Sequence, residues 1–258
     1  MKTALITGAT GAIGGAIAGL IAKKTYKVII VARDKAKAEK LVQSLVQETA
    51  NKNISYLLAD VSRKKEVASL AARIHEPVDV LINNAAATPR QREETPEGIE
   101  IQFATNVLGY YWMISNFIPH LKQAVPARIV NVASYWAGNL DLNDLEFKNR
   151  FYNNDTAYRQ SKQADRMLTV AFAEKLKGSG ITVNACHPGD VRSTLASNLG
   201  YGGHESPEQG AATPVWLATS EDVAHITRKY FEHLNESYCQ FSANTEAINK
   251  LFELCASY

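Results

Sequence analysis

Short runs of apolar residues alternate along the whole chain with longer segments whose apolar residues recur at the helical period. An apolar run of this kind is typical of a buried strand, and an apolar stripe is typical of a helix packed on one side. We therefore expect strands at residues 3–7, 27–32, 54–60, 78–84, 127–134 and 181–186, with a short seventh at 229–231. We expect helices at residues 12–24, 35–49, 67–74, 105–123 and 157–177, and a C-terminal helix for which Ser242 would be the N-cap.

This alternation predicts the fold class. Strands that are apolar throughout and separated by helices are typical of a parallel sheet covered on both faces. We expect an α/β protein with a single doubly wound, Rossmann-type sheet of about seven strands, formed by one domain over residues 1–258. Loops that follow the strands of such a sheet line its ligand crevice, so we expect substrate loops within 86–98, 136–156 and 190–210.

Charge and cysteine content exclude several classes of function. The 28 basic and 26 acidic side chains give a net charge of +2, which is too small to indicate a nucleic-acid partner. The 3 cysteines lie far apart, so they predict neither a disulfide framework nor a metal site. The chain shows no signal-peptide pattern and no apolar run that would span a bilayer. The expectation is a cytoplasmic protein without a membrane anchor.

Glycines are concentrated between the first expected strand and the first expected helix, in the sequence TGATGAIG. In this position Gly8 permits a tight turn, Gly11 lets the backbone approach a pyrophosphate, and Gly14 lets the helix pack closely on the strand. The N-terminus of the helix would then face the phosphates. The turn therefore predicts a dinucleotide site.

Two residues at strand ends bear on which dinucleotide binds. Arg33 follows the second strand, where an NAD site usually has an acidic residue that holds the ribose hydroxyls. A guanidinium there would pair with a 2′-phosphate, which favours NADP(H) over NAD(H), although Asp34 comes next. Asp60 ends the third strand and would either accept from the adenine amino group or cap the following helix.

The stretch AYRQSK places Tyr158 and Lys162 four residues apart, on one face of an expected helix. A neighbouring ammonium favours the phenolate form and lowers the pKa of a tyrosine. The strand at 127–134, upstream of this helix, ends in Ser134. A phenol beside a fixed ammonium predicts general acid–base chemistry.

Together these motifs resemble those of the short-chain dehydrogenase/reductase family. The resemblance covers nearly the whole chain, through TGATGAIG, NNAA (83–86), NVLG (106–109), RIVNVAS, YRQSK and HPGDVRST (187–194). Within the family it is nearest to the retinol dehydrogenase-like and WW-domain oxidoreductase-like group, because the gap between Ser134 and Tyr158 is lengthened and because GITVNACHPGDVRSTL and SPEQGA are similar.

The resemblance implies a catalytic tetrad of Asn106, Ser134, Tyr158 and Lys162. Tyr158 would exchange the proton, Ser134 would donate to the substrate oxygen, Lys162 would stabilise the phenolate and bind the ribose, and the Asn106 amide would hold a relay water. The cofactor would be lined by Gly8, Thr10, Gly11, Ala12, Ile13, Gly14, Arg33, Asp60, Val61, Asn84, Ala85, Ala86, Tyr158, Lys162, Pro188, Gly189, Val191 and Thr194. Tyr135 and Trp136 would line the substrate pocket or pack as buried aromatics, and His187 would be structural.

Two departures from the family pattern keep other functions open. The turn reads TGxxGxxG, a spacing found in nucleotide-sugar epimerases and dehydratases, and the asparagine motif is NNAA in place of NNAG. The function expected first is an NADP(H)-dependent oxidoreductase that interconverts a small, apolar carbonyl compound and its alcohol. The alternatives are an epimerase or dehydratase and a non-catalytic dinucleotide sensor. The resemblance also implies a homodimer or homotetramer as a possible assembly, formed through the helices at 105–123 and 157–177.

Overall fold

A computed structural model describes residues 1–258 and contains one eight-stranded sheet in the order β3-β2-β1-β4-β5-β6-β7-β8. All neighbouring strands are parallel except β7 and β8. The strands are β1 (Thr3–Thr7), β2 (Lys27–Ala32), β3 (Ile54–Leu58), β4 (Val80–Asn83), β5 (Ala127–Val132), β6 (Ile181–His187), β7 (Tyr230–Glu232) and β8 (Asn235–Ser237). The order reverses between β1 and β4, and a ligand crevice opens at the carboxyl ends of strands at such a point.

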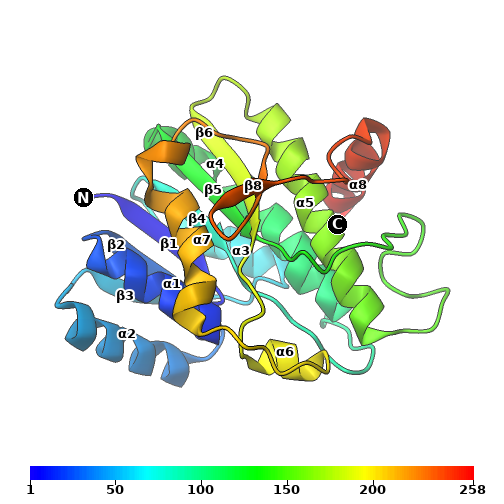
Figure 1. Ribbon diagram of the computed structural model, residues 1–258, viewed down its shortest axis with the longest axis horizontal. Helices are drawn as coiled ribbons and strands as arrows, with labels where there is room; N and C mark the ends of the chain where they lie inside the picture. The colour runs from blue at the N-terminus through cyan, green and yellow to red at the C-terminus, as the bar shows by residue number, and fades with distance from the viewer.

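Helices cover both faces of the sheet, as Figure 1 shows. The helices are α1 (Ala12–Lys23), α2 (Lys35–Thr49), α3 (Lys64–Arg73), α4 (Gly109–Gln123), α5 (Asn154–Lys175), α6 (Thr194–Asn198), α7 (Pro207–Thr219) and α8 (Thr245–Ser257), with a π-helical segment η1 (Phe103–Leu108) before α4 and a 3₁₀ turn η2 (Glu221–Val223) after α7. One apolar core lies between the sheet and α1, α2 and α7, and the other between the sheet and α3, α4, α5 and α8. The doubly wound α/β fold predicted from the sequence is confirmed.

The eighth strand adds to the expected seven because β7 turns back on itself. His233 and Leu234 connect β7 to β8 with φ values of 47° and 64°. A two-residue turn with both residues at positive φ matches the twist of antiparallel strands. The turn lacks the Asn-Gly or Asp-Gly pair that usually marks such a hairpin, so the pattern did not predict it.

Most helix bounds differ from the expectation by a few residues, and α6 and α7 are helices that the pattern did not predict. α7 begins within the segment read as a loop, because Ser206 and Gln209 form a reciprocal capping box and Pro207 occupies the first turn. α8 begins after Asn244, whose side chain accepts from the Ala247 N–H at 3.0 Å, and Asn244 therefore replaces Ser242 as the N-cap. No helix in the structure is long and apolar enough to cross a membrane.

Candidate active site

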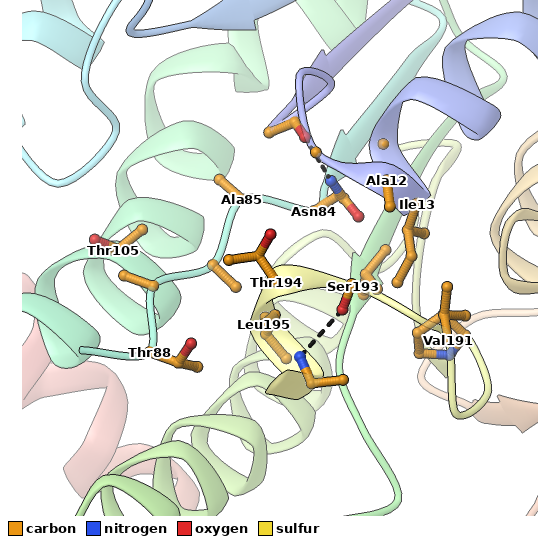
Figure 2. Close-up of a pocket in the computed structure, with 18 of the residues that line it drawn as sticks. Ala12, Ile13, Asn84, Ala85, Thr88, Thr105, Val191, Ser193, Thr194 and Leu195 are labelled. Carbon is orange, nitrogen blue, oxygen red and sulfur yellow. Dashed lines mark hydrogen bonds between the residues drawn. The ribbon is translucent and has the colours of Figure 1, made fainter. Parts of the chain in front are cut away.

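The glycine turn after β1 is held by side chains that follow β4. Asn84 donates through its amide to the carbonyls of Thr7 at 3.1 Å and Gly8 at 3.2 Å. Figure 2 shows the Asn84 amide pointing toward this turn. The buried Thr7 hydroxyl accepts in return from the backbone N–H groups of Asn84 and Ala85 at 2.9 and 3.1 Å. The ends of β1 and β4 are thereby fixed to each other at the point where the strand order reverses.

Gly8 and Gly14 occupy positions that admit no side chain. Gly8 has a φ of +66°, and a Cβ there would lie 2.6 Å from the Ala85 Cα. A Cβ on Gly14 would lie 2.4 Å from the Gly8 carbonyl oxygen and 2.6 Å from the Asn84 Nδ2. Both glycines are thus required by close backbone packing, as the sequence predicts.

We expect Gly14→Ala to lower the free energy of unfolding by about 1–3 kcal/mol, because backbone atoms must move to admit the methyl group. Urea denaturation without cofactor measures this. Gly19→Ala in the same helix is the control, since its Cβ would meet only the flexible end of Leu45 at 3.2 Å. An equal effect of both substitutions would mean that the tight turn carries no special constraint.

The N-terminus of α1 is open toward the pocket. Gly11 is its N-cap, with no side-chain hydrogen bond to the first N–H groups and no acidic residue in the first turn. A Cβ on Gly11 would meet only the Gly8 carbonyl oxygen, at 3.4 Å. Free N–H groups and the positive end of the helix dipole are suited to bind phosphate oxygens. Figure 2 shows Ala12 and Ile13 on this side of the pocket, with Thr194 and Val191 from the segment after β6 facing them.

Arg33 and Lys37 place two cations at the end of the pocket beside β2 and α2. Asp34 is the N-cap of α2 and accepts from the Lys37 backbone N–H at 3.0 Å. Unlike its two basic neighbours, Asp34 does not line the pocket. The acidic residue that obscured the sequence signal therefore has a structural role.

Asp60 also lines the pocket but is engaged locally. Its Oδ1 accepts from the backbone N–H and hydroxyl of Ser62 at 3.0 and 2.7 Å, and its Oδ2 lies 3.7 Å from an Arg33 nitrogen. Asp60 does not cap α3, whose N-cap is Arg63; its bonds to Ser62 instead stabilise the turn that precedes this helix. The adenine contact stays a prediction.

Tyr158 lies in the first part of α5 and faces the end of β5, where Ser134 lies. Both residues line the pocket, and both are buried. Burial raises the pKa of the Tyr158 phenol above its ordinary value, while the neighbouring Ser134 hydroxyl opposes that rise. The direction is the reverse of the one expected from a neighbouring ammonium, because burial is the largest effect on this pKa and the charges of Asp165 and Asp190 add to it.

Lys162 is buried one turn further along α5. Its Nζ donates to the Val132 carbonyl at 3.1 Å and to the Asp165 carboxylate at 2.8 Å, and it lies 5.8 Å from the centre of the Tyr158 ring. Burial is the largest single effect and lowers the pKa of the Lys162 ammonium, but Asp165 and Tyr110 together outweigh burial, so the net direction of the pKa is upward. The sequence did not single out Asp165.

Asn106 lies in η1 and is fully buried outside the pocket. Its Nδ2 donates to the Ala87 carbonyl at 3.2 Å and to the Ser161 hydroxyl at 3.1 Å, and its Oδ1 accepts from the Ala87 N–H at 2.8 Å. Both amide hydrogens are therefore used, so the amide could hold a water only through the second lone pair of its Oδ1, and the relay water stays a prediction. Asn106 ties the segment after β4 to α5.

A single cavity of about 940 Å³ collects the predicted residues. All the residues expected around the cofactor line it, as do Ser134, Tyr135 and Trp136, whereas Asn106 does not. No group of three His, Cys, Asp or Glu side chains that could hold a metal ion is present. Reasoning from the sequence missed further lining residues, among them Lys37, Thr88, Glu93, Thr105, Ser193, Tyr201 and His204. Lys37 could have been found from its place one turn into the helix after Arg33.

The expected substrate loops contribute unequally. Segments 86–98 and 190–210 supply several lining residues, but 136–156 supplies Trp136 alone. Residues 144–147 of that loop are buried against the structure below it: the Glu146 carboxylate accepts from the Tyr258 hydroxyl at 2.6 Å, and the Leu145 carbonyl accepts from Gln160 at 2.8 Å. The expectation that 136–156 shapes the pocket is therefore correct only at its first residue.

Three aromatic side chains form the mouth of the cavity beside Tyr158. Tyr135, Trp136 and Tyr201 each remain 38–45% exposed. The Trp136 ring centre lies 6.0 Å from that of Tyr135 and 6.3 Å from that of Tyr201. The Trp136 Nε1 donates to Asp155 at 2.6 Å, so the indole is held from outside the cavity.

His187 is a neutral imidazole that packs behind Tyr135 at the mouth of the cavity. It is buried and packs edge-on against Tyr135, with ring centres 4.6 Å apart. Burial lowers its pKa to about 3, and the charges of His233 and Arg166 act in the same direction. The packing agrees with the structural role expected for His187.

Comparison with known proteins identifies the family. The family model described as short chain dehydrogenase matches residues 2–201. Human retinol dehydrogenase 13 is 34% identical over 255 residues, which cover 91% of this chain and 77% of that protein. Mouse retinol dehydrogenase 12 is 32% identical over 244 residues, covering 89% of this chain and 77% of that protein. The chain belongs to the short-chain dehydrogenase/reductase family of oxidoreductases and is retinol dehydrogenase-like, as its motifs predict.

Solved structures agree on the fold. A structure of an uncharacterized protein from Mycobacterium paratuberculosis has a TM-score of 0.84 at 24% identity, covering 100% of this chain and 94% of that one. The RhlG/NADP active-site complex of Pseudomonas aeruginosa has a TM-score of 0.72 at 24% identity, covering 90% of this chain and 94% of that one. At these identities the two structures support the fold alone.

Proposed function

We propose that this chain is an NADP(H)-dependent oxidoreductase that interconverts an apolar aldehyde or ketone and the corresponding alcohol. One observation carries the proposal: Tyr158, Ser134 and Lys162 line the same cavity as the glycine turn. Membership of the family supports the reaction class, and the retinol dehydrogenases among its relatives are oxidoreductases by name.

The cavity fits a nicotinamide dinucleotide. The glycine turn leaves room for backbone to meet a pyrophosphate, and the open N-terminus of α1 offers N–H donors to it. Arg33 and Lys37 would hold a 2′-phosphate, since guanidinium and ammonium groups make charge-assisted contacts with phosphate oxygens. Ala86, which replaces the family's glycine, is not among the residues of positive φ and therefore adds no backbone strain. When bound, the cofactor supplies or accepts the hydride.

The protein's own groups would manage the proton and the developing charge. In reduction the Tyr158 hydroxyl donates its proton to the substrate oxygen, and in oxidation the phenolate accepts the alcohol proton. The Ser134 hydroxyl donates to the same oxygen while negative charge builds on it. Because burial raises the pKa of Tyr158, the phenol is the dominant form near neutral pH, which suits reduction. Oxidation needs the phenolate and should therefore accelerate as pH rises.

The aromatic mouth supports an apolar substrate. We expect Trp136→Ala to raise the KM for aryl ketones and aldehydes by about tenfold, because the aromatic ring of such a substrate loses its stacking partner. The KM for short aliphatic carbonyl compounds should change little. Phe151→Ala is the matched control, because Phe151 lies in the same loop, is fully exposed and does not line the cavity. Equal effects on aryl and aliphatic substrates would contradict a stacking role.

The first experiment measures loss of NADPH and NADH absorbance with a panel of aldehydes, ketones and quinones. Turnover faster with NADPH supports both the reaction and the cofactor proposed. NADPH binding with no turnover on any panel member would favour the dinucleotide sensor. Conversion of a nucleotide sugar without net cofactor consumption would favour the epimerase, which the TGxxGxxG spacing kept open.

Assembly stays a prediction. The helices expected to build a dimer or tetramer are α4 and α5, and α8 covers part of their surface. Phe252 of α8 packs on Tyr111 of α4 and Phe172 of α5, with ring centres 5.1 Å apart in both pairs. A dimer through these helices would therefore have to include α8.

A further inference from the structure

Lys162 and Asp165 form a buried ion pair behind the proposed proton donor. Their side chains are 3% and 0% exposed, and the Nζ to Oδ2 distance is 2.8 Å. A lysine ammonium has three donors. One is given to Asp165 and one to the Val132 carbonyl, which leaves a single donor for Tyr158 or a ribose hydroxyl.

The Asp165 carboxylate is committed to this lysine alone. Its Oδ1 is buried without any hydrogen-bond partner, and Lys162 provides its one ion pair. A buried carboxylate with an unpartnered oxygen is costly, so the fold retains it against its own stability. Such a cost is typical of functional groups.

We propose that Asp165 is a positioning residue that holds the Lys162 ammonium against β5 and compensates its charge, thereby setting how strongly that charge acts on Tyr158. The inference rests on the proposed function, because Tyr158 is the acid–base group of that function. Lys162 and Asp165 together act on Tyr158 as a dipole, whose field falls off faster than that of a free ammonium.

The charges that face Tyr158 agree with this proposal. Burial is the largest effect on the pKa of Tyr158 and raises it; the neighbouring Ser134 hydroxyl lowers this pKa, and the charge of Asp165 raises it. Burial also raises the pKa of Asp165 to about 7, with Lys162 opposing that rise. The titratable groups that surround Tyr158 and Lys162 are Lys162 and Asp165 on α5, Tyr110 on α4, Tyr135 after β5, Cys186 on β6, Asp190 after β6 and Tyr201 after α6.

The test replaces the carboxylate with an amide of the same shape. Asp165→Asn keeps an oxygen that can accept from Lys162 and removes the negative charge. Protein labelled with ¹³C at the tyrosine ζ carbon is titrated, and the Tyr158 signal is identified by its absence in Tyr158→Phe. We expect the phenolate transition of Tyr158 to begin about one pH unit lower in Asp165→Asn than in the wild type.

Two further variants make the result specific. Glu174→Gln removes an exposed carboxylate of α5 that pairs with Arg228 at 2.9 Å, and it should leave the Tyr158 titration unchanged. Asp165→Ser, which is neutral and smaller, is titrated if the asparagine variant does not fold. An unchanged Tyr158 transition in a folded Asp165 variant would overturn the proposal and leave Asp165 a purely structural residue.

The titration needs neither cofactor nor substrate, so its outcome is separate from that of the proposed function. In the enzyme assay, the pH profile of kcat for alcohol oxidation should shift to lower pH in Asp165→Asn by the same amount, with KM little affected. A shifted titration without any turnover would refute the proposed function and support the role of Asp165. Turnover in which neither the pH profile nor the Tyr158 titration is shifted by Asp165→Asn would support the proposed function and refute the role of Asp165.

Discussion

Replacing Tyr158 with phenylalanine should lower kcat for carbonyl reduction by about a hundredfold or more, because the variant has no group that can give a proton to the substrate oxygen. NADPH affinity should stay nearly unchanged, since Lys162 and the glycine turn remain in place. Ser134 still donates a hydrogen bond in the variant, so the residual rate should exceed the rate without enzyme. Steady-state kinetics and fluorescence titration of NADPH measure the two quantities separately.

Tyr258→Phe provides the matched control for this loss of one phenol hydroxyl. Tyr258 donates to Glu146 at 2.6 Å and lies outside the cavity, so its replacement should leave kcat unchanged. Full activity of Tyr158→Phe would show that another group transfers the proton. A loss of NADPH binding as large as the loss of kcat would instead point to collapse of the site.

The sequence predicted the fold well wherever one local signal dominated. The strand at Lys27–Ala32 and the helix at Lys35–Thr49 have the expected bounds, because the apolar run and the apolar stripe are uninterrupted there. The β7–β8 hairpin was missed since His233 and Leu234 adopt positive φ without glycine or asparagine. α7 was missed although Ser206 and Gln209 spell a capping box, because the glycine and prolines around it indicated a loop.

The site was predicted less evenly, for a physical reason. Residues fixed by backbone geometry or by position at a strand end, such as Gly14 and Ser134, lie where the motifs placed them. The partners of a side chain depend on packing between elements that are distant in the sequence. Asn106 therefore binds Ala87 and Ser161, two partners that the sequence did not indicate. Asp165 follows Lys162 by only three residues, but nothing in the sequence shows that both are buried.

The two cations beside β2 and α2 should decide cofactor choice. We expect Arg33→Ala to weaken NADPH binding by about tenfold and the double variant with Lys37→Ala by about a hundredfold, because each cation contributes one charge-assisted contact to a 2′-phosphate. NADH affinity should change little, since NADH has no phosphate there. Parallel titrations of the two cofactors at one salt concentration give the ratio.

Exposure limits the size of this effect and also provides a second check. The Arg33 and Lys37 side chains are 65% and 71% exposed, so their attraction for phosphate is screened by salt. Added NaCl should therefore weaken NADPH more than NADH in the wild type, and the difference should shrink in the double variant. Lys35→Ala removes a cation from the same helix that pairs with Glu39 and does not line the cavity, so it should leave both affinities unchanged. Equal losses of NADPH and NADH in the double variant would mean that these cations act on a part of the cofactor common to both. In that case the 2′-phosphate would not be what Arg33 recognises, and the preference for NADP(H) would have to be abandoned.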